Sequence, residues 1–265
     1  MLKRLILIVL LLFAAVRAEA LEFTDVYFDP SEPGWGVFLV QSDKFQFLAF
    51  FIYGADGKPT WYTAQLADDG TGNYTGSVYA ITGTWFASPW QGYNINAAGT
   101  AAFRPIDIYH ATLTYTVNGV GTVTKAIQRE TLTPYVLSGN YSGSMSGSIS
   151  GCTDPTRNDA AFRGRYGLSA TQVADESVTL MFTFVDAIHT GIVCTLSGPL
   201  THLGRLYQFN AQMTCSGPGQ SGSPHSVTID SLHPTGQGIE GHLTGQTGGG
   251  CTSSLHFSAV LNVNN

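Results

Sequence analysis

The stretch that decides the fold is Tyr27–Leu66, YFDPSEPGWGVFLVQSDKFQFLAFFIYGADGKPTWYTAQL, in which short aromatic and branched runs alternate with turn signals. The apolar runs are divided at Pro33-Gly34, Ser42-Asp43 and Asp56-Gly57. Asp-Gly accepts the positive φ angles that tight hairpins require, and runs of this length are typical of antiparallel strands. The stretch therefore predicts a β-meander, and no catalytic pattern is visible in it.

The same pattern continues towards the C-terminus. Ala111–Val117 and Val120–Ile127 flank Asn118-Gly119, a strong signal for a two-residue hairpin turn. Five later runs are also expected to be strands: Ser177–Val185, Gly191–Leu196, Leu206–Cys215, Ser226–Leu232 and Leu255–Val263. No long stretch after residue 20 has helical periodicity, so we predict an all-β protein of small antiparallel barrels or sandwiches.

Residues 1–20 have the layout of a secretory signal peptide. Lys3 and Arg4 precede the apolar run Leu5–Ala15, and the small residues Ala18 and Ala20 mark a cleavage site. An uncleaved anchor is the alternative, but eleven apolar residues fall short of the ~20 that cross a bilayer. We therefore expect a secreted or periplasmic protein with no membrane span after cleavage of the leader.

The charge of the mature chain excludes some classes of partner. Loss of residues 1–20 removes three of twelve basic and one of eighteen acidic residues, which leaves nine against seventeen and a net charge of −8. The remaining basic residues are scattered, with Arg163 and Arg165 the nearest to a cluster. Because nucleic acids and anionic membranes require a basic face, neither is expected as a partner.

Four cysteines, all in the second half of the chain, indicate two disulfides in an oxidising compartment. Cys194 and Cys215 stand symmetrically about Leu203-Gly204, so a hairpin that turns there places them opposite each other. This leaves Cys152 to pair with Cys251. Zinc is the alternative ligand of these cysteines, but the chain has no C-x-x-C pair.

The length and the distribution of residue types favour two domains after the leader. All four tryptophans precede residue 91 and all cysteines follow residue 151, which predicts that indole rings pack the first domain and disulfides brace the second. Pro134 cannot donate a ladder hydrogen bond, so we place the boundary between domains 21–135 and 136–265. The heptapeptides Gly72–Val78 and Gly139–Met145 share five residues, and duplication of a β-unit is one explanation of this similarity.

The aromatic residues of the first half are the first candidates for ligand contact. Trp35 adjoins the Pro33-Gly34 turn, and Trp90 and Tyr93 lie in an apparent loop, where flat rings stack on sugars or other flat ligands. The alternative is that these rings fill a small core, which we favour for Trp61 because it begins a strand. We name Trp35, Trp90 and Tyr93 as ligand-binding residues for a glycan or a small apolar ligand.

Patterns for catalysis and for metals are weak. The histidines of the second half form no H-x-H or H-x-x-x-H pair, and we predict neither a metal site nor a cofactor. Gly219–Pro224 is similar to the nucleophile motif of trypsin-like proteases, with Ser221 at the nucleophile position. Gln220 and Ser223 depart from that motif, so a secreted serine hydrolase is kept only as an alternative.

Two further motifs carry a family resemblance. Asp29–Gly36, DPSEPGWG, and Gly57–Tyr62, GKPTWY, resemble a module of uncharacterised exported bacterial β-rich proteins with the pattern N-P-x-E-x-G-x-G followed by G-x-P-x-W-Y. Asp29 stands where that pattern usually has Asn. The resemblance implies export and β-structure, and it implies no catalytic residues.

From the sequence we predict an exported, noncatalytic binding protein of the cell envelope or the extracellular space. The aromatic residues of the first half favour a ring-stacking ligand, since no acid, base and nucleophile constellation accompanies them. A structural or adhesive envelope protein is the third hypothesis, which the low share of charged residues, 11%, supports.

Overall fold

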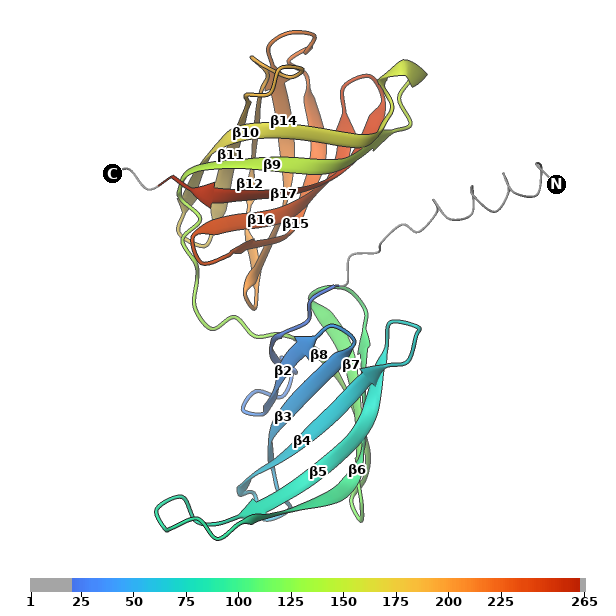
Figure 1. The fold of residues 1–265 in the computed structure, drawn as a ribbon, viewed down its shortest axis with the longest axis vertical. Coiled ribbons are helices and arrows are strands. Elements are labelled where there is room, and N and C mark those ends of the chain that lie inside the picture. Colours follow the sequence, from blue (N-terminus) through green and yellow to red (C-terminus); the bar gives the residue numbers. More distant parts are fainter. Residues whose placement is uncertain (1–20, 263–265) are drawn as a thin grey trace, which may run out of the picture.

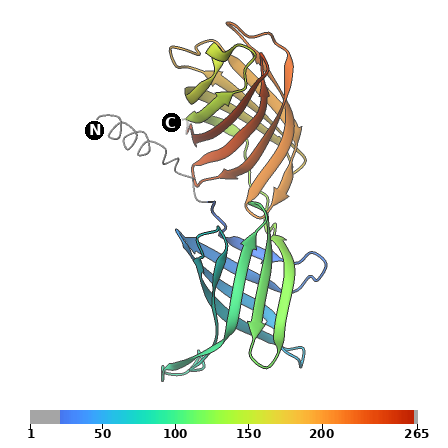
Figure 2. The ribbon, with the colours of Figure 1, turned by 90° about the vertical axis from the view of Figure 1, so that its right-hand side faces the viewer.

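The protein is described here by a computed structural model that covers residues 21–262, so the predicted signal peptide lies outside the described residues. These residues form β-strands and a single turn of 3-10 helix, Pro155–Arg157. The strands build two separate sheets, which Figures 1 and 2 show end to end. The prediction of an all-β protein with two small antiparallel units in tandem is confirmed.

The first sheet is a closed antiparallel barrel in which the strands follow one another in chain order. It closes where Tyr27 and Phe28 of the first strand pair with Arg129 and Gln128 of the last. Asp43, with φ of 51°, turns the chain between the second and third strands. The strands are β1 (Asp25–Phe28), β2 (Gly36–Ser42), β3 (Phe45–Tyr53), β4 (Pro59–Asp68), β5 (Tyr74–Gly83), β6 (Tyr93–Pro105), β7 (His110–Val117) and β8 (Gly121–Arg129).

Alternate residues of these strands fill the interior of the N-terminal barrel. The largest buried rings are those of Tyr27, Phe50 and Phe103, and no tryptophan is among the buried core residues. The prediction that indoles pack this domain is therefore wrong. Trp61 lies outside because the buried Ala64 and Leu66 fix the even positions of β4 as the inward ones.

The second sheet is also a ring, although its order departs from the chain order. β12 pairs with both β11 and β14, and this second pairing closes the sheet. Three of the strands, β10, β13 and β16, have no counterpart among the runs expected from the sequence, and β9 begins with the repeated heptapeptide Gly139–Met145. The strands are β9 (Gly139–Ser150), β10 (Asp159–Val173), β11 (Ser177–Phe184), β12 (Val193–Pro199), β13 (Thr201–Leu203), β14 (Leu206–Ser216), β15 (Pro224–Pro234), β16 (Gly238–Thr247) and β17 (Cys251–Leu261).

Both disulfides are present in the pairing that the sequence predicts. Cys194 and Cys215 face each other across the closing β12–β14 pair, with Cα atoms 4.0 Å apart. Cys152 and Cys251 join residues 99 positions apart in the chain. Two disulfides are typical of an oxidising environment outside the cytoplasm.

The same tyrosine hydrogen bond closes one end of each closed sheet. Tyr27 of β1 donates a hydrogen bond from its hydroxyl to Phe23 O (2.9 Å), and Tyr141 of β9 donates one to Leu137 O (2.8 Å). Both bonds reach back four residues and hold a buried apolar side chain, Phe23 or Leu137, in the end of the ring. The segment that enters each ring therefore also plugs it.

The repeated heptapeptides have the same local role but occupy different strands. Tyr74 begins β5, the fifth strand of the N-terminal barrel, whereas Tyr141 lies in β9, the first strand of the C-terminal sheet. Both tyrosine side chains are buried. A Cβ on Gly76 or Gly143 would lie about 2 Å from a carbonyl oxygen of the neighbouring strand, at 1.9 and 2.1 Å respectively. Glycine at these positions permits close strand approach, so the similarity reflects a shared strand geometry.

The plugged ends of the two rings face each other. Arg205, in the β13–β14 turn, forms salt bridges with Glu22 and Asp25 of the N-terminal segment. Ser231 N donates to the hydroxyl of Tyr109 (2.9 Å), whose pKa is raised to about 12 mainly by burial. The opposite ends of both rings are consequently the outer poles of the molecule.

Arg129 is the most deeply buried charge in the N-terminal barrel. Its side chain has no exposed surface, and its guanidinium donates to Ile108 O (2.8 Å), Thr24 O (3.2 Å), Glu22 O (2.7 Å) and the Asp25 carboxylate (2.8 Å). A buried charge is tolerated only when it is paired and its hydrogen-bonding groups are satisfied. Arg129 therefore ties the entering segment to the β6–β7 loop across the end of the barrel.

Replacing Arg129 tests this role. Arg129→Met keeps much of the side-chain volume but leaves the buried Asp25 carboxylate without its nearest guanidinium partner, which we expect to lower the free energy of unfolding by about 3–5 kcal/mol. Because all four tryptophans lie in this barrel, urea unfolding followed by tryptophan fluorescence reports the loss. Arg163→Met, at an exposed position of β10, should change stability by less than about 0.5 kcal/mol. Equal effects of the two substitutions would contradict the account.

Candidate functional site: the calyx of the C-terminal ring

The C-terminal ring has an apolar bore that opens at the outer pole. Buried side chains of six different strands face one another inside it, and no strand contributes a charged group at this depth. The bore residues that line the open part are Met145, Phe162, Phe182, Phe184, Met213, Leu243 and Leu255. Since successive side chains of a β-strand point to opposite faces of the sheet, every second residue of a strand can contribute to this lining.

These side chains surround a cavity of about 470 Å³, which we call the calyx. Pockets for small molecules usually measure about 300–1,000 Å³ and are lined mainly by apolar and aromatic groups. Small eight-stranded barrels have interiors that are either filled by side chains or hold one small ligand. The calyx gives the C-terminal ring the size of interior that can hold one small ligand.

Polar groups gather at the mouth of the calyx. Four loops or turns supply them: residues 150–159, 184–193, 216–224 and 247–251. They include the guanidinium of Arg157 and the carboxylate of Asp159, and the imidazole of His225 joins them from the start of β15. A molecule inside the calyx would therefore meet apolar groups along its body and hydrogen-bonding groups at its outer end.

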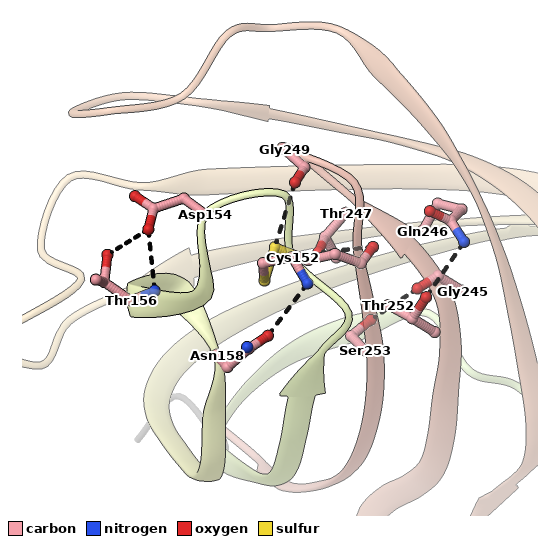
Figure 3. Close-up of a disulfide and its surroundings, with 11 residues drawn as sticks. Cys152, Asp154, Thr156, Asn158, Gly245, Gln246, Thr247, Gly249, Thr252 and Ser253 are labelled. Carbon is pink, nitrogen blue, oxygen red and sulfur yellow. Dashed lines mark hydrogen bonds between the residues drawn. A yellow bond between two sulfur atoms is a disulfide. The ribbon is translucent and has the colours of Figure 1, made fainter.

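A disulfide fixes the loop that carries Arg157 (Figure 3). Cys152 is bonded to Cys251 at the start of β17, and Cys152 N donates to the Asn158 side chain (3.1 Å). Thr156 donates from its N–H (3.0 Å) and its hydroxyl (2.7 Å) to the Asp154 carboxylate, which caps the 3-10 turn. The rim is thus held by covalent and capping interactions.

His189 forms another side of the mouth, and Asp186 positions it. The His189 ring packs on Phe162 and Phe184, with centroids 5.1 and 5.6 Å away, and its Nδ1 lies 2.8 Å from the Asp186 carboxylate. The same carboxylate accepts hydrogen bonds from the backbone N–H groups of His189 (3.0 Å) and Arg165 (3.1 Å). Desolvation alone would raise the pKa of Asp186, but these hydrogen bonds outweigh it and hold the pKa below its usual value.

The aromatic residues named from the sequence lie in the other ring. Trp90 and Tyr93 belong to the β5–β6 hairpin, are 70% and 60% exposed, and have ring centroids 6.1 Å apart. Trp35 is only partly exposed and packs against the barrel core. The ring contacts of residues 21–262 pair Trp90 with Tyr93, and neither with Trp35.

The motif that carries the family resemblance acts as a cover for the outer pole of the N-terminal barrel. Glu32 forms a salt bridge with Lys125, which points inward from β8 and lies 6.0 Å from the Trp35 ring centroid. The hydrogen bond with Glu32 raises the pKa of Lys125. Tyr53 donates from its hydroxyl to Gly34 O (2.8 Å). Together these contacts fasten the β1–β2 loop to the barrel.

Ser221, the residue of the hydrolase alternative, lies at the mouth of the calyx. Its Oγ accepts a hydrogen bond from the backbone N–H of Ser223 (3.3 Å). A Ser–His–Asp row exists elsewhere, on the outer face of the ring: Ser254 Oγ is 3.0 Å from His242 Nε2, and His242 Nδ1 is 3.3 Å from Asp230. The row lies on a regular ladder whose backbone N–H groups bond neighbouring strands, an arrangement unlike an oxyanion hole.

Sequence analysis predicts no site in the C-terminal ring, although Cys194, Cys215 and Ser221 are singled out there for other reasons. The signal that could have found it is the recurrence of Phe and Met at alternate positions of glycine-rich strands. Among residues 21–262, no group of three or more His, Cys, Asp or Glu side chains could hold a metal ion. Over the same residues, no helix has the length and apolar character required to cross a membrane.

Comparison with known proteins gives no family: the chain matches no protein-family model and no curated protein sequence. The functional argument therefore depends on the geometry of the site.

Asp186→Asn tests the support of His189 through its pH dependence. A carboxylate whose pKa is lower in the folded state contributes stability that is complete above its unfolded pKa and is lost as the pH falls through its folded pKa. We expect the variant to melt below the wild type at pH 7, and the difference to narrow as the pH falls below the ordinary value of 3.8. Melting curves recorded by circular dichroism at pH 7 and pH 3 measure this.

The control is Asp43→Asn, at an exposed hairpin turn, which should melt like the wild type at both pH values. A melting difference for Asp186→Asn that is the same at pH 7 and pH 3 would show that the charge of Asp186 is not what stabilises the folded state.

Proposed function

We propose that the protein is an exported, noncatalytic binding protein and that the calyx holds one small, mainly apolar molecule. The observation that carries this proposal is the cavity of about 470 Å³ inside a closed ring, with apolar walls and a polar mouth. Transfer of an apolar molecule from water into such a space is favourable by roughly 25 cal/mol per Å² of apolar surface buried. The polar mouth would orient the ligand.

The calyx is suited to binding because little reorganisation is required. The ring has no free edge where β12 meets β14, and the disulfide Cys194–Cys215 joins these strands beside the cavity. A preformed site avoids much of the ordering cost that reduces affinity. Binding in the bore therefore requires only entry past the loops of the mouth.

Export is the second part of the proposal. The two disulfides favour an oxidising compartment, and the expected leader, residues 1–20, supplies a route to it. We infer that the protein acts in the periplasm or outside the cell.

Two methionines of the same ring provide a matched test. Met213 lines the calyx, whereas Met181 of β11 points outward and is exposed. Met213→Trp should fill the cavity and weaken binding of the neutral apolar probe N-phenyl-1-naphthylamine at least ~10-fold, because the larger ring occupies the ligand volume. Met181→Trp should leave the affinity unchanged. Titration of probe fluorescence measures both affinities.

Met213→Ala guards against misfolding as the explanation, since it enlarges the cavity and should still bind the probe. Unchanged probe binding by Met213→Trp, in a variant whose circular dichroism matches the wild type, would place the probe outside the calyx and refute the proposal.

The β5–β6 hairpin supports a second candidate function, the binding of a glycan or another ring-stacking ligand. Trp90 and Tyr93 offer two largely exposed rings at a centroid distance of 6.1 Å, and Trp85 and Phe86 of the same hairpin are also exposed. Exposed aromatic side chains with a polar handle are common anchors of ligand interfaces. Trp35, in contrast, is assigned mainly to the cover of the barrel.

If the hairpin binds glycans, Trp90→Ala should weaken binding to any responsive oligosaccharide by at least ~10-fold, because it removes an aromatic anchor. Trp61→Ala, at another exposed tryptophan of the same barrel, is the control and should bind as the wild type does. Isothermal titration against a panel of soluble oligosaccharides measures the affinities. Equal affinities of wild type and Trp90→Ala would remove this function from the hairpin.

A further inference from the structure

One side of the N-terminal barrel has an apolar outer surface. The outward positions of β2, β3 and β4 carry a group of large apolar side chains that are 39–56% exposed, which we call the apolar face. Its members are Phe38, Val40, Phe45, Phe47, Phe51, Tyr53 and Trp61. No charged residue lies between Gly36 and Ser42 or within β3.

The register of the strands makes this surface continuous. Phe51 pairs with Trp61 across β3 and β4, and Val40 pairs with Phe47 across β2 and β3. Phe38 and Phe51 also touch, with ring centroids 5.2 Å apart in an edge-to-face arrangement. The rings therefore form one contiguous patch over three neighbouring strands.

The opposite side of the same barrel is polar, which shows that apolar exposure is not a general property of its surface. The outward positions of β7 and β8 are mostly threonines, and Thr114 with Thr124 and Thr116 with Thr122 form cross-strand hydrogen bonds of 3.1 and 2.9 Å. A sheet face that meets water usually carries such residues. The β2–β4 side departs from this rule.

The size of the apolar face matches one side of a small protein interface. Each aromatic ring can bury 150–250 Å², so the exposed halves of six rings and one valine amount to roughly 650 Å². The largest patch on a typical monomer is about 300–600 Å², and each partner of a standard interface buries about 800 Å². A modest polar rim would supply the remaining area.

We propose that the apolar face is the interface of a homodimer, in which β2–β4 of one copy pack on β2–β4 of a second copy about a two-fold axis. A two-fold interface brings the same patch onto itself, and the uncharged centre of this face allows that without repulsion between like charges. The closed barrel offers no edge strand for pairing. Association through side chains of the outer face is the remaining way to cover the rings.

The charges at the rim suit this arrangement. β3 runs between the Asp43–Lys44 turn and the turn that carries Asp56 and Lys58, so each end of the face presents one carboxylate and one ammonium. When two β3 strands pack antiparallel across a two-fold axis, the first turn of one copy lies beside the second turn of the other. Each acid can then meet a base of the partner, which favours a second copy over an anionic surface that would be repelled by an acidic chain.

Sedimentation velocity of the full exported chain tests the proposal, with Phe51→Lys as the variant. The wild type should sediment as a dimer at micromolar concentrations. Phe51→Lys places two like charges near the axis of the interface and should raise the dissociation constant at least ~100-fold. Ala126→Lys, at an outward exposed position of β8 on the polar side, should remain dimeric.

Circular dichroism and melting of both variants separate dissociation from unfolding. A wild type that is monomeric throughout the concentration range overturns the proposal, and so does a folded Phe51→Lys variant that remains dimeric. A monomeric wild type that co-sediments with phosphatidylcholine vesicles would also overturn it and would assign the face to a lipid surface.

Discussion

The closing of each sheet into a ring is the constraint on which the other features of this protein depend. A strand with a free edge exposes unpaired backbone N–H and C=O groups, and a ring removes both edges. In the C-terminal sheet this closure is the pairing of β12 with β14, where Cys194 lies directly opposite Cys215. Without that pairing, the apolar inner face would open to water and the calyx would have no wall on one side.

The two rings share an architecture but differ in what fills them. Large rings such as those of Tyr27, Phe50 and Phe103 are buried in the N-terminal barrel, and Tyr27 and Phe103 contact edge to face. The C-terminal ring also buries large rings, among them Tyr166, Tyr207 and Phe182, but it keeps a cavity beside Met145 and Met213. The calyx, rather than the fold, therefore makes the C-terminal ring the candidate binding barrel.

Much of the fold could be predicted from the sequence because turns and alternation are local properties. Asn118-Gly119 and the Cys194–Cys215 spacing each specify a hairpin-like return of the chain, and both appear in the structure. β10 and β16 could not be recognised, since glycines such as Gly164 and Gly241 interrupt their apolar pattern. Trp61 lies outside the core, contrary to the prediction, because one aromatic residue at the start of a strand does not reveal which side faces inward.

The site could not be predicted for a different reason. Its walls come from residues between Met145 and Leu255, which are brought together only when the ring closes. Alternation along one strand tells which side chains point inward, but whether they leave a cavity depends on the combined volumes of the inward side chains of six strands. The local sequence carries no information on that combined volume. It does indicate an aromatic side chain in a loop, such as that of Trp90.

A crystal of the protein pressurised with xenon tests the central claim most directly, because xenon binds in dry apolar cavities of adequate size. The account predicts a xenon atom in the C-terminal bore, between the side chains of Met213, Phe182 and Leu255. A bore filled by collapsed side chains or by ordered water, with no xenon bound, would contradict it.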